Sequence, residues 1–81
     1  MNIRAGKKNL PPMTTVTITD EYIKLGQALK LAGFVGSGTD AKYVISEGMV
    51  EVNGEVEVRR GRKLVPGDVV SFQGERFQIE A

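Results

Sequence analysis

The stretch "YIKLGQALKLAGFVGSGTDAKYVISEG", residues 22 to 48, carries the pattern that decides the fold. In its first part, residues 22 to 32, a polar side chain recurs at every third position among leucines and alanines. Because that spacing puts the apolar side chains on one face, it predicts an amphipathic helix. Gly33 is typical of the residue that follows a helix C-terminus, so the helix is expected to end there.

The second part of the stretch predicts another short helix. Ser37 and Asp40 are three residues apart, which is typical of a helix N-cap and its first turn. Residues 41 to 45 then place apolar side chains on one face, and Gly48 is typical of a C-terminal glycine. The stretch therefore predicts two helices joined by a tight glycine-rich turn over residues 33 to 38.

The segments on either side of the helices have the composition of β-strands. "TTVTIT" (14 to 19) precedes the helices, and the strand-like runs "MVEVNGEVEV" (49 to 58), "VVSF" (69 to 72) and "RFQIE" (76 to 80) follow them. Pro66-Gly67 fits a type II turn before "VVSF". The predicted fold class is α+β, with a helix-turn-helix-like pair of short helices packed on a small curled antiparallel sheet.

The dipeptide Asn53-Gly54 predicts a hairpin, whose register follows from the face that is buried. A two-residue loop would place Val50 and Val52 opposite glutamates on the same face, which conflicts with a half-buried sheet. An odd-length loop or a bulge pairs Val50 with Val56 instead, and this is the predicted register.

The length of 81 residues allows one domain with a small core. Residues 1 to 13 are interpreted as a flexible basic tail or an added leader, and residues 14 to 81 as a single domain. The chain has no cysteine, and no apolar run approaches the roughly 18 residues of a membrane span. The expectation is a cytoplasmic monomer that does not enter a membrane.

The absence of histidine as well as cysteine removes the usual catalytic bases, thiol nucleophiles and transition-metal ligands. The serines and acidic residues show no catalytic motif. We therefore expect a protein that is not an enzyme and that uses no cofactor and no metal.

The run "RRGRK", residues 59 to 63 and called the basic loop below, is the strongest functional signal. It holds four positive charges in five residues, although the whole chain has a net charge of only +1. Like charges at this density repel one another, which disfavours a loop that is merely solvated. Gly61 predicts a turn that spreads the side chains outward. The pattern favours contact with phosphates, with a salt-dependence slope of roughly −3 to −4 if all four charges bind.

The glycine-rich turn is open to two interpretations that are compatible with each other. One is a tight connection between the helices. The other is a phosphate site, because the amides of Gly38 and Thr39 at the start of a helix favour an anion, and Lys42 lies one turn further on.

The segment from "LGQALKL" to "PGDVV" resembles the RNA-binding domain named for ribosomal small-subunit protein four. The resemblance covers residues 22 to 72, and it is carried by Gly33-Phe34-Val35 before Ser37 and by "VNG" at 52 to 54 with "GD" downstream. The chain looks most like the short, stand-alone bacterial members, which have a basic-glycine-basic run at the place of the basic loop.

The resemblance implies an alpha-L RNA-binding motif, with structured RNA such as rRNA or tRNA held against the second helix and the adjacent loops. It also implies association with a ribosomal subunit or other RNA-processing proteins. The family often has an arginine directly after the turn serine, where this chain has Gly38, so the contacts shift to Lys42 and the basic loop.

The predicted RNA-binding residues are Arg59, Arg60, Arg62, Lys63, Lys42, Lys30, Ser37, Gly38, Thr39 and Lys24. The alternative function is a protein-interaction adaptor that docks an acidic partner through the basic loop. Steep loss of binding with salt favours RNA, whereas salt-tolerant, stoichiometric capture of one protein favours the adaptor.

Overall fold

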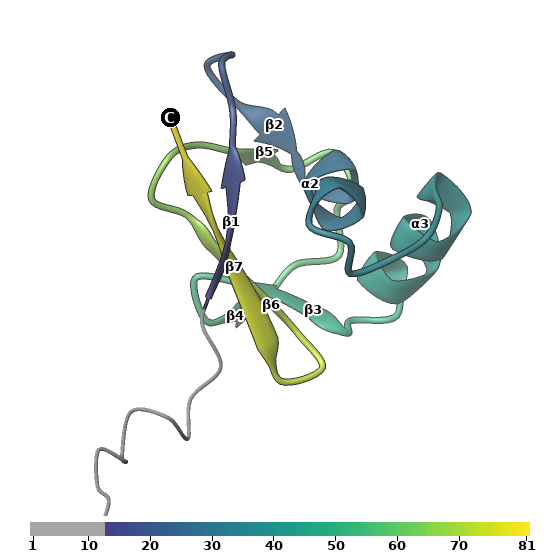
Figure 1. Cartoon of the computed structure of the whole chain (residues 1–81). Helices are drawn as coiled ribbons and strands as arrows, with labels where there is room; N and C mark the ends of the chain where they lie inside the picture. Colours follow the sequence, from purple (N-terminus) through teal and green to yellow (C-terminus); the bar gives the residue numbers. More distant parts are fainter. Residues whose placement is uncertain (1–12) are drawn as a thin grey trace, which may run out of the picture.

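The computed structural model describes residues 13–81 (Figure 1), so nearly all of the predicted basic tail lies outside the described residues. Within 13–81, the helices α2 (Leu25–Leu31) and α3 (Gly38–Ser46) lie together on one side of the molecule, beside the strands. The arrangement confirms the α+β fold class and the helix-turn-helix-like pair.

Helix α2 begins later than the sequence pattern predicted. Residues Ile23–Lys24 form the short strand β2, which pairs antiparallel with β5 (Lys63–Leu64). The extended backbone at Lys24 places this residue at the N-cap position instead of inside the helix. The apolar face of α2 is buried as predicted, and Gly33 follows the helix with a φ of 78°.

Helix α3 has the predicted start, stripe and end. The Asp40 backbone N–H donates a hydrogen bond to Ser37 Oγ at 3.1 Å, which is the predicted N-cap. Ala41, Val44 and Ile45 are buried, and Gly48 has a φ of 76°, a conformation that glycine adopts without steric cost.

The main sheet of the described residues has five strands in the order β1-β7-β6-β3-β4. Their bounds are β1 Thr14–Thr17, β3 Val50–Val52, β4 Glu55–Val56, β6 Val69–Phe72 and β7 Glu75–Glu80. The prediction of an antiparallel sheet was wrong at one edge, because β1 runs parallel to β7. The long connection between these strands permits either direction, and the parallel register sets Val16 beside Ile79, both of which are buried.

The predicted odd-length hairpin loop was wrong. Val52 pairs with Glu55 and Glu51 with Val56, which leaves a two-residue loop in which Asn53 and Gly54 both have positive φ. The register brings Glu57 beside Val50, where its backbone N–H donates to the Val50 carbonyl at 3.0 Å. A glutamate is tolerated on this buried side because Arg59 and Arg62 compensate its charge.

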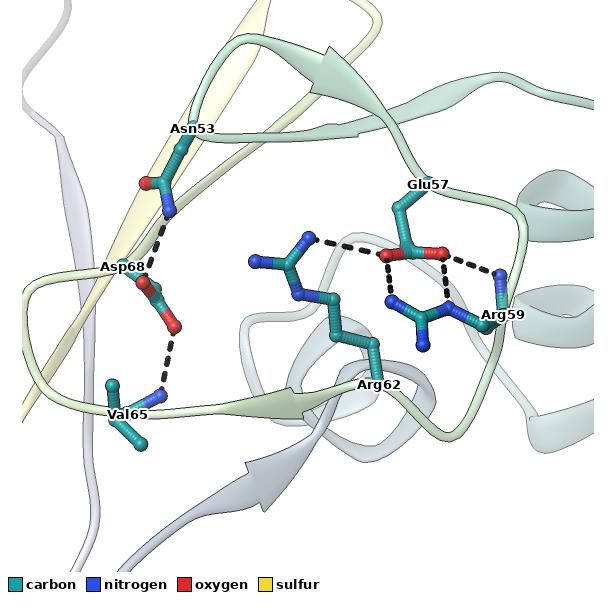
Figure 2. Close-up of polar contacts among 6 residues, drawn as sticks. All are labelled: Asn53, Glu57, Arg59, Arg62, Val65 and Asp68. Atoms are coloured by element: carbon teal, nitrogen blue, oxygen red, sulfur yellow. Dashed lines mark hydrogen bonds and ion pairs between the residues drawn. The ribbon is translucent and has the colours of Figure 1, made fainter.

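A polar contact ties this hairpin loop to the turn before β6 (Figure 2). Asn53 Nδ2 donates to Asp68 Oδ1 at 3.0 Å, and Asn53 Oδ1 accepts from the Val69 backbone N–H at 2.9 Å. Asp68 Oδ2 in turn accepts from the Val65 backbone N–H at 2.9 Å. The "VNG" and "GD" motifs are therefore structural, since together they fix two loops of the sheet.

Replacing Asn53 with alanine is expected to lower the free energy of unfolding by about 1–2 kcal/mol. The change removes two side-chain hydrogen bonds. It also puts alanine at a φ of 53°, a backbone conformation that asparagine tolerates better because its side chain can form local hydrogen bonds. Urea denaturation measures the difference. Gln73→Ala is the matched control, because Gln73 has the same φ of 53° in the loop before β7. Equal destabilisation of both variants would show that backbone conformation, and not the Asn53 side chain, carries the effect.

Candidate nucleic-acid interface

The basic loop is attached to the start of α2. The backbone N–H of Leu25 donates to the Arg62 carbonyl at 2.8 Å, and that of Gly26 donates to the Arg60 carbonyl at 3.0 Å. Helix α2 has no side-chain N-cap, so these loop carbonyls satisfy N–H groups that a helix start leaves without intrahelical partners. The basic charges are thereby held beside α2. The resemblance implied RNA contacts at the second helix, so the first helix is an additional part of the candidate interface.

A groove opens where the basic loop, α2 and the start of α3 meet, and it is called the basic groove below. It has a volume of about 330 Å³ and is lined by Lys24, Gly26, Gln27, Lys30, Gly38, Ala41, Arg60 and Gly61. Three of these side chains are cationic and none is acidic. Lys24, Lys30 and Arg60 come from three separate elements, so the fold converges their charges on one concave surface.

Gly26 explains how Arg60 reaches this groove. A Cβ atom added to Gly26 would lie 2.7 Å from Arg60 Cγ and 3.3 Å from Arg60 Cδ. The missing side chain therefore makes room for the stem of Arg60 to cross the buried start of α2.

The other two arginines of the basic loop are bound to a glutamate (Figure 2). Arg59 donates to the Glu57 carboxylate through Nε and Nη2, both at 2.9 Å, and through its backbone N–H at 3.0 Å. Arg62 Nη1 adds a fourth contact at 3.1 Å. Glu57 is 6% exposed, so its carboxylate is satisfied by protein donors in place of most of its water.

These contacts change the acidity of Glu57. The side-chain hydrogen bond from Arg59 is the largest cause, and together the contacts lower the pKa of Glu57 from 4.5 to about 2. The same carboxylate raises the pKa of Arg59. The basic loop is thus less positive than its four cationic side chains suggest, because Arg59 and Arg62 share one carboxylate.

The two remaining cations of the basic loop are placed differently. Arg60 lines the basic groove, whereas Lys63 Nζ lies 4.7 Å from the centroid of the Tyr22 ring, a cation–π contact. Arg59, Gly61, Arg62 and Lys63 also line a shallow hollow of about 520 Å³, and Gly61 is common to this hollow and the basic groove. The four basic residues therefore form a surface continuous with the groove.

The predicted residues around the glycine-rich turn are partly brought into this surface. Gly38 lines the basic groove, and Thr39 is exposed in the first turn of α3. The Ser37 hydroxyl is occupied as the N-cap, and Lys42 is exposed on α3 without lining the groove. Asp40 adds a negative charge to the same turn, which opposes a phosphate there.

Glu57, Gly26, Gln27 and Tyr22 were not singled out as site residues from the sequence. Asn53-Gly54 did carry a signal for Glu57, because this dipeptide favours a two-residue loop, and that loop places Glu57 beside Val50. No local pattern distinguishes Gly26 or Gln27, since their role depends on the position of the basic loop.

Two further classes of site are not supported within residues 13–81. The structure shows no group of three or more histidine, cysteine, aspartate or glutamate side chains placed to hold a metal ion in this part of the chain. Nor does any helix there have the length and apolar character needed to cross a membrane.

The family model described as "S4 domain" matches residues 16–80. "Probable ribosome maturation protein RlbA" of Bacillus subtilis (strain 168) is 52% identical over 59 residues, covering 73% of this chain and 83% of that protein. "Putative RNA-binding protein YbcJ" of Escherichia coli (strain K12) is 45% identical over 60 residues, covering 74% and 86%. The solution structure of YbcJ from E. coli, described as revealing an alfaL motif involved in RNA-binding, has a TM-score of 0.69 to this chain at 40% identity. The match covers 89% of this chain and 92% of that one.

Proposed function

The chain belongs to the S4 domain family, and on that premise we propose that it is a non-catalytic module that binds structured RNA mainly through backbone phosphates. The observation that carries the proposal is the basic groove, in which Lys24, Lys30 and Arg60 converge without an acidic lining residue. Such a surface attracts the phosphates of RNA. A protein that binds phosphates recognises the shape of the RNA more than its base sequence.

Ribosomal RNA is the first candidate partner and tRNA the second. The relative in B. subtilis bears the name of a ribosome maturation protein, and the relative in E. coli that of an RNA-binding protein. Both are short proteins, of which this chain covers more than four fifths. We also propose that the protein acts in the cytoplasm as a monomer that contacts a ribosomal subunit through the RNA.

Titration of a labelled, structured ribosomal RNA fragment with the full chain tests the proposal. If the three cations of the groove meet phosphates, the salt-dependence slope is about −2.7, so affinity falls about 40-fold between 50 and 200 mM salt. Absence of RNA binding at low salt would contradict the proposal. Salt-tolerant, stoichiometric capture of one acidic protein would support the adaptor function in its place.

A further inference from the structure

A second hollow lies beside the basic groove, between the end of β1 and helix α2. It has a volume of about 280 Å³ and is called the apolar hollow below, after its exposed tyrosine and leucine. Half of its lining residues are apolar and half are polar: Ile18, Tyr22, Ile23 and Leu31, with Thr17, Thr19, Asp20 and Gln27. Tyr22 is 39% exposed and Leu31 is 60% exposed. Two large apolar side chains are thus left partly uncovered at one place on the surface.

The apolar hollow is continuous with the basic groove. Gln27 lines both of them, and Tyr22 in the hollow is close in the chain to Lys24 in the groove. Lys63 of the basic loop covers one face of the Tyr22 ring. A ligand that binds in the groove therefore has an aromatic side chain and a leucine within its immediate reach.

We propose that the apolar hollow receives the base of one unpaired nucleotide while a neighbouring phosphate of the same strand lies in the basic groove. This inference rests on the proposed RNA-binding function and adds what that function leaves open, the kind of RNA structure selected. Bulged or looped-out bases are the parts of a folded RNA that expose a face for stacking on an aromatic ring.

The chemistry of the hollow suits a base better than a phosphate. Its cationic neighbours lie in the groove and the basic loop, whereas its own lining includes the carboxylate of Asp20, which repels an anion. That carboxylate accepts hydrogen bonds from exocyclic amino groups, and the Gln27 amide both donates and accepts. The hollow therefore favours a base with an amino group, such as cytosine, over uracil.

The Lys63 contact supports the same role for Tyr22. Lys63 Nζ lies over one face of the ring, 4.7 Å from its centroid, so a base in the hollow is expected to stack on the opposite face. The contact restrains the ring while leaving Tyr22 39% exposed.

Two RNA hairpins with the same loop test the inference: one has a fully paired stem, and the other differs only by a single bulged cytidine in that stem. Wild-type protein is expected to bind the bulged hairpin about tenfold more tightly, which is the order of one stacked base. Tyr22→Ala is expected to lose this preference, because its affinity falls more for the bulged hairpin than for the paired one, and Tyr22→Phe is expected to retain it. Thermal unfolding of each variant confirms that it is folded.

Tyr43→Ala is the matched control, because Tyr43 is 61% exposed on α3 and lines neither the groove nor the hollow. It is expected to keep the full preference for the bulge. Equal wild-type affinity for both hairpins, or an equal loss by Tyr22→Ala on both, would overturn the inference. If wild-type protein bound neither hairpin, the proposed RNA-binding function itself would fail, which is a distinct result.

A spectroscopic measurement separates stacking from an indirect effect of the Tyr22 change. The chain contains two tyrosines, so a Tyr43→Phe background leaves Tyr22 as the single tyrosine signal. Its ring protons are expected to move upfield with the bulged hairpin and to stay unchanged with the paired one. Self-association that Tyr22→Ala abolishes would assign the hollow to a second copy of the chain and would reject the proposal.

Discussion

Replacement of Lys24, Lys30 and Arg60 together by glutamine is expected to weaken binding to structured RNA about 100-fold near physiological salt, with a salt-dependence slope close to zero. The three cations line one groove, so their removal takes away the phosphate contacts that the fold brings together. Glutamine keeps the Cγ and Cδ atoms of Arg60 that lie over Gly26, so the start of α2 remains covered. RNA titration at several salt concentrations gives both quantities.

The control for this triple change is the double variant Arg76→Glu and Thr15→Glu. It lowers the net charge by the same three units, but it acts on exposed positions of β7 and β1 that do not line the groove. It is expected to weaken binding less than tenfold, because salt screens the interaction between these exposed positions and an RNA bound in the groove. If the triple variant kept its affinity while glutamine at Arg59, Arg62 and Lys63 abolished it, the phosphates would lie against those three side chains and not in the groove.

Replacement of Glu57 by glutamine is expected to lower the free energy of unfolding by about 2 kcal/mol at pH 7. Glutamine keeps the shape of the side chain but loses the charge that binds Arg59 and Arg62. Its NH2 group replaces one carboxylate oxygen, so a donor then faces the N–H donors of the arginines. The expected loss is smaller than the free energy that corresponds to the full pKa shift of Glu57, because Arg59 is 71% exposed and water screens its charge. Urea denaturation provides the measurement.

The effect of Glu57 is expected to depend on pH with a definite sign. Its pKa is about 2 in the folded protein and near its ordinary value of 4.5 when unfolded. As the pH falls, the unfolded chain takes up the proton first, so the stabilisation is complete above about pH 5 and is lost progressively towards pH 2. The difference in stability between wild type and Glu57→Gln should shrink over that range.

Glu55→Gln is the matched control for both measurements. It makes the same charge change on the same hairpin, but Glu55 is exposed and contributes none of the contacts around Arg59 and Arg62. Its stability should differ from wild type by less than about 0.5 kcal/mol. A Glu57→Gln variant as stable as Glu55→Gln at every pH would show that the ion pairs only compensate for the burial of the carboxylate.

The features that were predicted correctly depend on local chemistry. The N-cap of α3, its buried stripe and its C-terminal glycine follow from side chains a few residues apart, as the Ser37 and Asp40 hydrogen bond shows. The apolar face of α2 follows in the same way. The predicted start of α2 was too early. Residues 23 and 24 have helical spacing in the sequence, but Ile23 pairs with Leu64 and they form strand β2 instead.

The hairpin shows why a correct rule gave a wrong register. A glutamate opposite a buried valine is unfavourable by itself, so the bulged register was preferred for the sequence. Glu57 nevertheless lies on the buried side, because Arg59 and Arg62 return to its carboxylate. The sequence shows that Glu57 and the two arginines have opposite charges. It does not show that the basic loop folds back and brings the arginines to Glu57.

The sequence by itself determined the two helices, the order along the chain of the strands of the main sheet and the presence of a basic loop, because each depends on neighbours within a turn or a hairpin. Only the tertiary structure decided that β1 lies parallel to β7, that Glu57 holds two arginines, and that Lys24, Lys30 and Arg60 share one groove. The physical reason is that these arrangements join residues from separate elements, whose relative position is set by the packing of the common core.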